Sequence, residues 1–118
     1  MRLLCLAVLA IASVGWAQQA PGHFLIELEL TPGVDVTHLS EAQISTFQQH
    51  GARLAKLCDE GVVIVGGRTA NLQHPRAVVI VTAKDAAAAR SVVEDDPAVK
   101  AGLMKASVEP FALLIPPR

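Results

Sequence analysis

The chain has 118 residues, a formal net charge of −1 and 52% hydrophobic residues. This length fits one domain, which can bury a single core without disulfides or metals. The charge is close to neutral and aromatic residues make up only 3% of the chain, so the sequence lacks both the basic stripe and the stacking residues of nucleic-acid-binding proteins. We therefore expect no nucleic-acid partner.

The N-terminal stretch MRLLCLAVLAIASVGWAQQAPG has the pattern of an export signal. Arg2 precedes an apolar run of 12 residues, long enough for a signal core and too short to span a bilayer. The small residues Gly15 and Ala17 suit cleavage before Gln18. We expect residues 1–17 to be a cleavable signal peptide; an uncleaved membrane anchor is the alternative.

Cleavage at this point would leave 101 of the 118 residues, and the loss of Arg2 would change the formal charge to −2. Residues 18–22 would form a flexible leader, 23–115 the folded domain and 116–118 a C-terminal tail. In a bacterium the product would be periplasmic or secreted, with no stable membrane association after cleavage.

The cysteines and histidines indicate neither a disulfide nor a metal site. Cys5 would leave with the signal, so Cys58 has no partner within the chain. We expect Cys58 to be a small buried residue on the apolar face of a helix, with a reactive thiol as the alternative. The four histidines show no ligand spacing, and no nucleotide-binding or nucleophile motif occurs. We expect no metal and no cofactor.

The predicted domain opens with a strand and a long helix. His23–Leu30 alternates along its length, which predicts a strand with one strongly apolar face, ended by Thr31-Pro32-Gly33. A helix is expected over Glu41–Asp59 with Ser40 as its N-cap. Gly61 is expected to adopt the left-handed conformation just after the helix.

The predicted helix carries one apolar stripe at three- and four-residue spacing. Its members are Ile44, Phe47, Gly51, Leu54 and Cys58, with Leu57 widening it. At about 100° per residue, His50 lies at the edge of this stripe, where a pocket could reach it.

Two short apolar segments, Val62–Val65 and Ala77–Val81, follow the helix. Neither alternates with polar residues, so both are expected to be strands that are covered on both faces. Gly66-Gly67 is expected to end the first of them, and a polar turn over Arg68–His74 leads to the second.

The last third of the chain predicts a second helix, from Asp85 or Thr82 to about Glu94. Asp95-Asp96-Pro97 ends it, because the residue before a proline avoids the helical region. One more helical turn over Ala98–Gly102 and a final strand over Ser107–Ile115 complete the domain. Pro110 within that strand indicates an edge position or a bulge.

The resulting order, β-α-β-β-α-β, is that of an α+β ferredoxin-like fold. Two helices would cover one face of a four-stranded antiparallel sheet. The other face would remain open although apolar residues point to it, and an exposed apolar face of that size is usually an interface. We expect a homodimer in which the open sheet faces of two copies meet.

Two stretches, FQQHGARLAKLCDEGVVIVGGRT and AAAARSVVEDDPAVKAGLMKASVEPF, resemble the YCII-related (YciI-like) family of the dimeric α+β barrel superfamily. The resemblance covers about His23 to Ile115. It implies a dimeric α+β barrel with a cleft that contains a histidine and an aspartate, which correspond to His50 and Asp96. The turn between the middle strands lacks a glycine that is common there, and the export signal is unusual for the family.

His50 would act as a general base or acid, since an imidazole titrates near neutral pH and a carboxylate behind it fixes its tautomer. The structural alternative is a half-buried histidine on a helix. Asp96 would orient His50; alternatively it only ends one helix and caps the next turn.

Glu27 is the charged residue that the alternation places on the otherwise apolar sheet face, and Arg68 ends a middle strand. Both are candidate substrate-binding residues, with salt bridges at the rim of a dimer as the alternative.

We predict an exported YCII-like enzyme of the lyase, isomerase or hydrolase type, in which a His-Asp pair transfers a proton on a small molecule without a cofactor. The alternative is a non-catalytic module of the cell envelope, either a binder of a small ligand in the cleft or a structural dimer. The sequence indicates no particular substrate.

Overall fold

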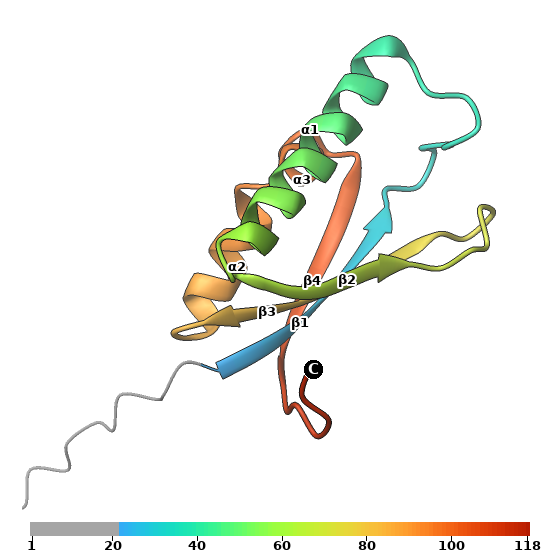
Figure 1. The fold of residues 1–118 in the computed structure, drawn as a ribbon. Helices are drawn as coiled ribbons and strands as arrows, with labels where there is room; N and C mark the ends of the chain where they lie inside the picture. Colours follow the sequence, from blue (N-terminus) through green and yellow to red (C-terminus); the bar gives the residue numbers. More distant parts are fainter. Residues whose placement is uncertain (1–21) are drawn as a thin grey trace, which may run out of the picture.

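The computed structural model describes residues 22–118, so the predicted signal peptide and residues 18–21 of the predicted leader lie outside the described residues. Seven elements follow one another along this part of the chain (Figure 1): β1 (Gly22–Leu30), α1 (Glu41–Asp59), β2 (Val63–Arg68), β3 (Arg76–Ala83), α2 (Ala86–Glu94), α3 (Pro97–Lys100) and β4 (Met104–Phe111).

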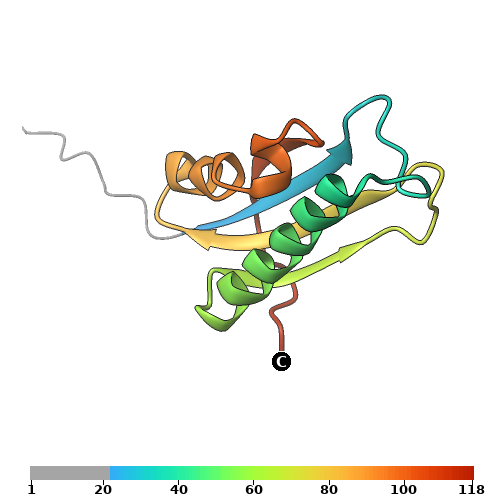
Figure 2. The ribbon, with the colours of Figure 1, turned by 90° about the horizontal axis from the view of Figure 1, so that it is seen from above.

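The four strands form one antiparallel sheet in the order β2-β3-β1-β4. Figure 2 shows α1 and the α2–α3 segment side by side over the same face of this sheet. This arrangement is the ferredoxin-like α+β fold, and it confirms the fold class predicted from the element order. β4 is an edge strand, as the proline at position 110 indicated.

The hydrophobic core lies between the sheet and the helices. Alternate residues of β1 point into it because side chains of a strand alternate between the two faces. The buried core residues are Phe24, Ile26, Leu28, Val63, Val79, Val81, Ala89, Val93, Ala98 and Met104. The small side chains in these helices let α2 pack close to β3 and β4, and α3 close to β4.

Both ends of α1 form as predicted. The Ser40 side chain accepts the backbone N–H of Gln43, and the Gln43 side chain accepts the N–H of Ser40, which makes a capping box. At the other end Gly61 has φ +77°, and the N–H of Val62 donates to the carbonyl of Leu57. This Schellman motif ends the helix and turns the chain into β2.

The bounds of three strands differ from the prediction, and β3 continues to Ala83 rather than ending at Val81. β2 continues through Gly66 and Gly67 to Arg68, because these residues keep their pairing with β3. β4 occupies Met104–Phe111 rather than Ser107–Ile115. It starts opposite Leu30, the last residue of β1, and ends opposite His23, so the neighbouring strand determines its length.

The apolar stripe of α1 is less buried than predicted. Phe47, Leu54 and Leu57 pack against the core, but α1 contains no fully buried residue. Ile44 is 44% exposed and Cys58 is exposed, so the prediction of a buried Cys58 is wrong for the isolated chain. The physical reason is that the part of β2 beneath the C-terminal half of α1 contains glycines, which fill none of the space under the helix.

The second face of the sheet has no helix over it. Val65 is 57% exposed there, and Val78 is also exposed. Leu25 pairs with Ile80, and Ile80 with Val65, so these apolar residues form one row across three strands.

Among residues 22–118, no helix is both long enough and apolar enough to cross a membrane.

Candidate active site

His50 and Asp96 are brought together by the packing of α1 against α3. The Nδ1 atom of His50 lies 2.7 Å from Oδ2 of Asp96, across 46 positions of sequence. His50 projects from the middle of α1, and Asp96 is the N-cap of α3. The two side chains are 13% and 3% exposed, respectively. The structure thus pairs the two residues that the family resemblance indicated.

The two carboxylate oxygens of Asp96 have different partners. Oδ1 accepts the backbone N–H groups of Ala98 and Val99, at 2.9 and 3.3 Å, and so caps the first turn of α3. Oδ2 holds the histidine. The structural and the functional interpretation of Asp96 are therefore compatible, because each uses a different oxygen.

Asp96 is the only buried charged residue among residues 22–118. Burial by itself would raise the pKa of its carboxyl group. The hydrogen bond and charge of His50, together with the two backbone N–H donors, outweigh burial and hold the pKa below its ordinary value. Asp96 is therefore an ionised acceptor at neutral pH. Because this carboxylate can only accept a hydrogen bond, a neutral His50 must carry its proton on Nδ1 to donate to it. Nε2 is then the ring nitrogen with a free lone pair.

Arg53, one turn after His50 on α1, completes the cluster. Its guanidinium donates to the backbone carbonyl of Val92 at 2.7 Å and lies 3.7 Å from Oδ2 of Asp96. It joins α1 to the end of α2 and puts a positive charge beside the buried carboxylate. This role was not predicted from the sequence, although the spacing of three between His50 and Arg53 places them on neighbouring positions of one helix face.

A pocket of about 390 Å³ lies between α1 and the strands β2 and β3. Its volume falls in the range of small-molecule sites. From α1 it is lined at positions four residues apart, and from the strands it is lined mainly by small or apolar residues. The lining residues are His50, Leu54, Cys58, Val63, Gly66, Gly67, Arg68, Ala77 and Val79.

Asp96 does not line this pocket. A separate cavity of only about 10 Å³ lies between its carboxylate and the core, which is too small to hold a ligand. His50 thus lies between the pocket, which it lines, and the carboxylate of Asp96, to which it is hydrogen-bonded. Asp96 can act on a bound molecule only through the histidine.

The structure separates the two other predicted site residues, Glu27 and Arg68. Glu27 pairs with Val78 and Ser107 on the open face of the sheet, whereas Arg68 pairs with Ala77 on the helix side and lines the pocket. Arg68 thus shares a pocket with His50, and Glu27 lies on the far side of the sheet. A substrate contact by either residue stays a prediction.

A β-bulge explains this separation. Val63 pairs with Val81, but Val65 pairs with Ile80, so β2 contains one extra residue between them. An insertion of one residue reverses the side on which every later side chain of the strand points. Without it Arg68 would pair with Arg76 and face the open side.

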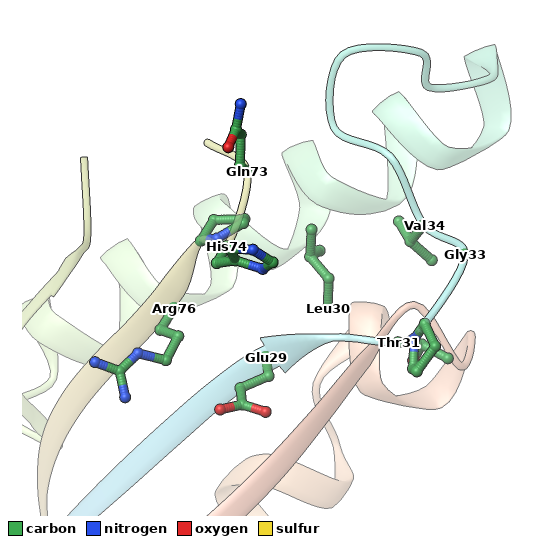
Figure 3. A pocket seen from close by; sticks show the side chains of 10 residues that line it. Glu29, Leu30, Thr31, Gly33, Val34, Gln73, His74 and Arg76 are labelled. Atoms are coloured by element: carbon green, nitrogen blue, oxygen red, sulfur yellow. The ribbon is translucent and has the colours of Figure 1, made fainter. Parts of the chain in front are cut away.

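A second hollow of about 390 Å³ lies at the far end of β1. Figure 3 shows Glu29 near the end of this strand, with His74 and Arg76 on the segment that enters β3. His74 is exposed on its turn. Neither His50 nor Asp96 lines this hollow.

Within residues 22–118, no group of three or more potential metal ligands occurs.

Comparison with known proteins identifies relatives of the chain. A model of the YCII-related domain family matches residues 16–112. Among solved structures, the chain is similar to 5-chloro-2-hydroxyhydroquinone dehydrochlorinase (TftG) from Burkholderia phenoliruptrix AC1100, in its complex with 2,5-dihydroxybenzoquinone. That similarity has a TM-score of 0.60 and 28% identity, and it covers 76% of this chain and 93% of the other. A search of proteins with curated descriptions finds no match.

Proposed function

This chain belongs to the YCII-related domain family, and we propose that it is a cofactor-independent enzyme in which His50 transfers a proton to or from a small molecule. The observation that carries the proposal is the hydrogen bond of 2.7 Å that joins His50, which lines the pocket, to the buried, ionised Asp96 behind it. A neutral imidazole with its Nδ1 proton held by a carboxylate has a basic Nε2 for general base catalysis.

The roles of the two residues follow from their positions. His50 would take a proton from the substrate at Nε2, and the carboxylate of Asp96 would stabilise the imidazolium that forms. His50 is the candidate catalytic residue because it lines the pocket. Asp96 is a positioning residue, since it does not line the pocket and its hydrogen bonds go to the histidine and the backbone of α3.

Of the three predicted reaction types, elimination by a lyase has the most support. The solved structure that resembles this chain is that of a dehydrochlorinase. Loss of hydrogen chloride from an organic molecule requires a base that takes the proton. The electron pair of the bond to that proton stays on the molecule and expels chloride as the C–Cl bond breaks. A single histidine base supported by a carboxylate is sufficient for this chemistry, and no electron carrier takes part.

The test uses the purified protein and its His50→Gln variant. Each is incubated with 5-chloro-2-hydroxyhydroquinone and with a panel of enolisable ring compounds, and we measure chloride release and the uptake of solvent deuterium. We expect the wild type to catalyse one of these reactions and His50→Gln to be at least ~100-fold slower. Equal rates for the two proteins, or no reaction by the wild type, would contradict the proposal.

A non-catalytic binding module is the alternative, and the pocket alone would serve it equally well. The two differ in what the loss of the imidazole changes. A binding module predicts that ligands raise the melting temperature of His50→Gln as much as that of the wild type and that neither protein turns them over. The buried partner of His50 favours the enzyme, since a pocket that only binds does not require a carboxylate behind its wall.

We also propose that two copies associate through their open sheet faces. The exposed side chains of Val65 and Val78 on this face support this, because apolar groups lose unfavourable contact with water when they are covered. In the dimer Glu27 would lie in the space between the sheets, where a contact with the substrate is still to be tested. We expect light scattering to give twice the mass of the chain for the wild type and the monomer mass for Val65→Asp. A monomeric wild type would exclude the dimer.

Export is the third part of the proposal, and it rests on the sequence of residues 1–17. We expect the protein in its native host to be recovered outside the cytoplasm with Gln18 at its N-terminus, as determined by mass spectrometry. Recovery in the cytoplasm with Met1 or Arg2 at the N-terminus would contradict export.

A further inference from the structure

The pocket beside His50 has an apolar interior with two cationic or basic groups at its wall. His50 lies on the α1 side and Arg68 on the β2 side. The apolar contributors are Leu54, Val63, Ala77 and Val79. No carboxylate lines the pocket, since Asp96 lies behind the histidine. An anionic ligand would therefore meet attraction from Arg68 without repulsion from the walls.

The guanidinium of Arg68 has N–H donors that remain available for a ligand. Within residues 22–118 its guanidinium makes one long hydrogen bond, of 3.4 Å, to the neighbouring carbonyl of Thr69 and lies within 4 Å of no carboxylate. A guanidinium carries five N–H donors in a planar fork that matches a carboxylate or a phenolate pair. Its place at the pocket wall is a consequence of the bulge in β2.

Gly66 keeps the floor of the pocket flat. It pairs with Val79, and a Cβ added to it would lie 3.5 Å from the Val79 side chain, in ordinary contact on the helix side. Its φ is not positive, so the backbone does not require glycine at this position. A glycine that the fold does not need, on the floor of a pocket, leaves room for a ligand to lie against the strand.

We infer that the pocket takes a flat organic acid, whose acidic oxygen binds Arg68 while its ring lies over Gly66 beneath α1. This inference rests on the proposed function, because it names the substrate class of the same site. When Nε2 of His50 takes a proton from an O–H or from a C–H beside a carbonyl, the electron pair stays on the substrate and spreads onto an oxygen. Arg68 stabilises the charge on that oxygen, and no oxidant or reductant is needed.

The charge part of the inference is tested by binding. Calorimetry compares benzoate with benzamide, which have the same shape and differ in charge, and adds 2,5-dihydroxybenzoquinone as a larger acid. We expect the wild type to bind benzoate about tenfold more tightly than benzamide, because a charge-assisted hydrogen bond has about that effect. Arg68→Gln should abolish this preference, and Arg68→Lys should retain part of it. A purely structural role of Arg68 would weaken both ligands equally.

The shape part is tested with Gly66→Ala. The added methyl group occupies the floor, so we expect the affinity for 2,5-dihydroxybenzoquinone to fall about tenfold while the melting temperature is retained. Gly51→Ala is the matched control, because it adds a methyl group to open space outside the pocket. Equal affinities of Gly66→Ala and wild type would overturn the placement of the ring.

The proposed proton transfer by His50 and the inferred substrate class can be refuted independently of each other. His50→Gln should keep the wild-type preference for benzoate over benzamide, since Arg68 is the source of that preference. If benzoate and benzamide bind equally well, or if no acid binds, the inferred substrate class is wrong, whereas loss of turnover in His50→Gln would still support the enzyme. If the acids bind through Arg68 and His50→Gln reacts at the wild-type rate, the proton-transfer role is wrong and the pocket remains an acid-binding site.

Discussion

His50 and Asp96 are 46 positions apart in sequence, and their side chains meet at 2.7 Å only because α3 packs against α1. The carboxylate that receives the histidine also caps α3 through its other oxygen. One residue thus fixes the start of a short helix and the orientation of an imidazole. Movement of α3 would change both, so the geometry of the pair depends on the packing of the two helices.

Replacement of Asp96 should separate its two functions. Asp96→Ala removes the cap and the partner of His50, and we expect the free energy of unfolding to fall by about 3 kcal/mol, the scale for breaking a buried pair. Asp96→Asn should be milder by about 1 kcal/mol, because the amide oxygen still caps the backbone of α3. Urea unfolding at pH 7 measures both. Equal losses for the two variants would show that the cap is not formed in solution.

The stability of the protein should depend on acid through Asp96. Its pKa is lower in the folded protein than its ordinary value, so the native state binds the proton less readily than the unfolded chain. The resulting stabilisation is present above pH ~4 and is lost as the pH falls below that value. We expect the free energy of unfolding of Asp96→Asn to change less between pH 5 and pH 3 than that of the wild type.

Asp35 provides the matched control for this measurement. Hydrogen bonds from Thr37 lower its pKa to about 2, yet it lies in an exposed loop away from the site. Asp35→Asn should therefore also flatten the acid dependence, without any effect on turnover at pH 7. If Asp96→Asn leaves the acid dependence unchanged, the lowered pKa of Asp96 is refuted.

Arg53 should contribute to stability through its bond to the Val92 carbonyl. We expect Arg53→Met, which keeps most of the aliphatic stem, to lower the free energy of unfolding by about 1 kcal/mol. Lys56→Met is the control on the same helix. Its ammonium group is 3.9 Å from Glu60 and highly exposed, so the change should stay within about 0.5 kcal/mol. Similar losses in both variants would show that the bond across to α2 adds nothing.

Two glycines of the α1 region should respond to alanine in opposite ways. Gly61 has φ +77°, where a Cβ is strained, so Gly61→Ala should destabilise the protein by about 1 kcal/mol. Gly51 lies inside α1, and a methyl group there would extend into open space, so Gly51→Ala should stabilise the protein by about 0.5–1 kcal/mol. Thermal unfolding of both variants decides this; a loss of stability in Gly51→Ala would mean that the helix surface there is covered in solution.

Much of the fold could be predicted because the relevant signals are local. The alternation in β1, the cap at Ser40 and the left-handed Gly61 each depend on a few neighbouring residues, and the structure contains all three. The length of β4 could not be predicted in this way. It is set by where β1 starts and ends, which is a property of the neighbouring strand.

The candidate site was predictable only in part. The resemblance of two stretches to the YCII-related family indicated His50 and Asp96, and the structure pairs them. The exposure of Cys58 and the role of Arg53 could not be predicted, since both depend on what lies opposite them. An amphipathic stripe shows which face of a helix is apolar but not whether the partner surface fills the space beneath it.

The sequence by itself determined the element types and their order, because hydrophobic periodicity and capping residues act over one or two turns of chain. Only the tertiary structure decided which charged side chains share a pocket. A single extra residue between Val63 and Val65 turns Arg68 toward His50 and leaves Glu27 on the opposite face. A bulge of this kind arises from strand pairing, and strand pairing depends on contacts between residues that are distant in the chain.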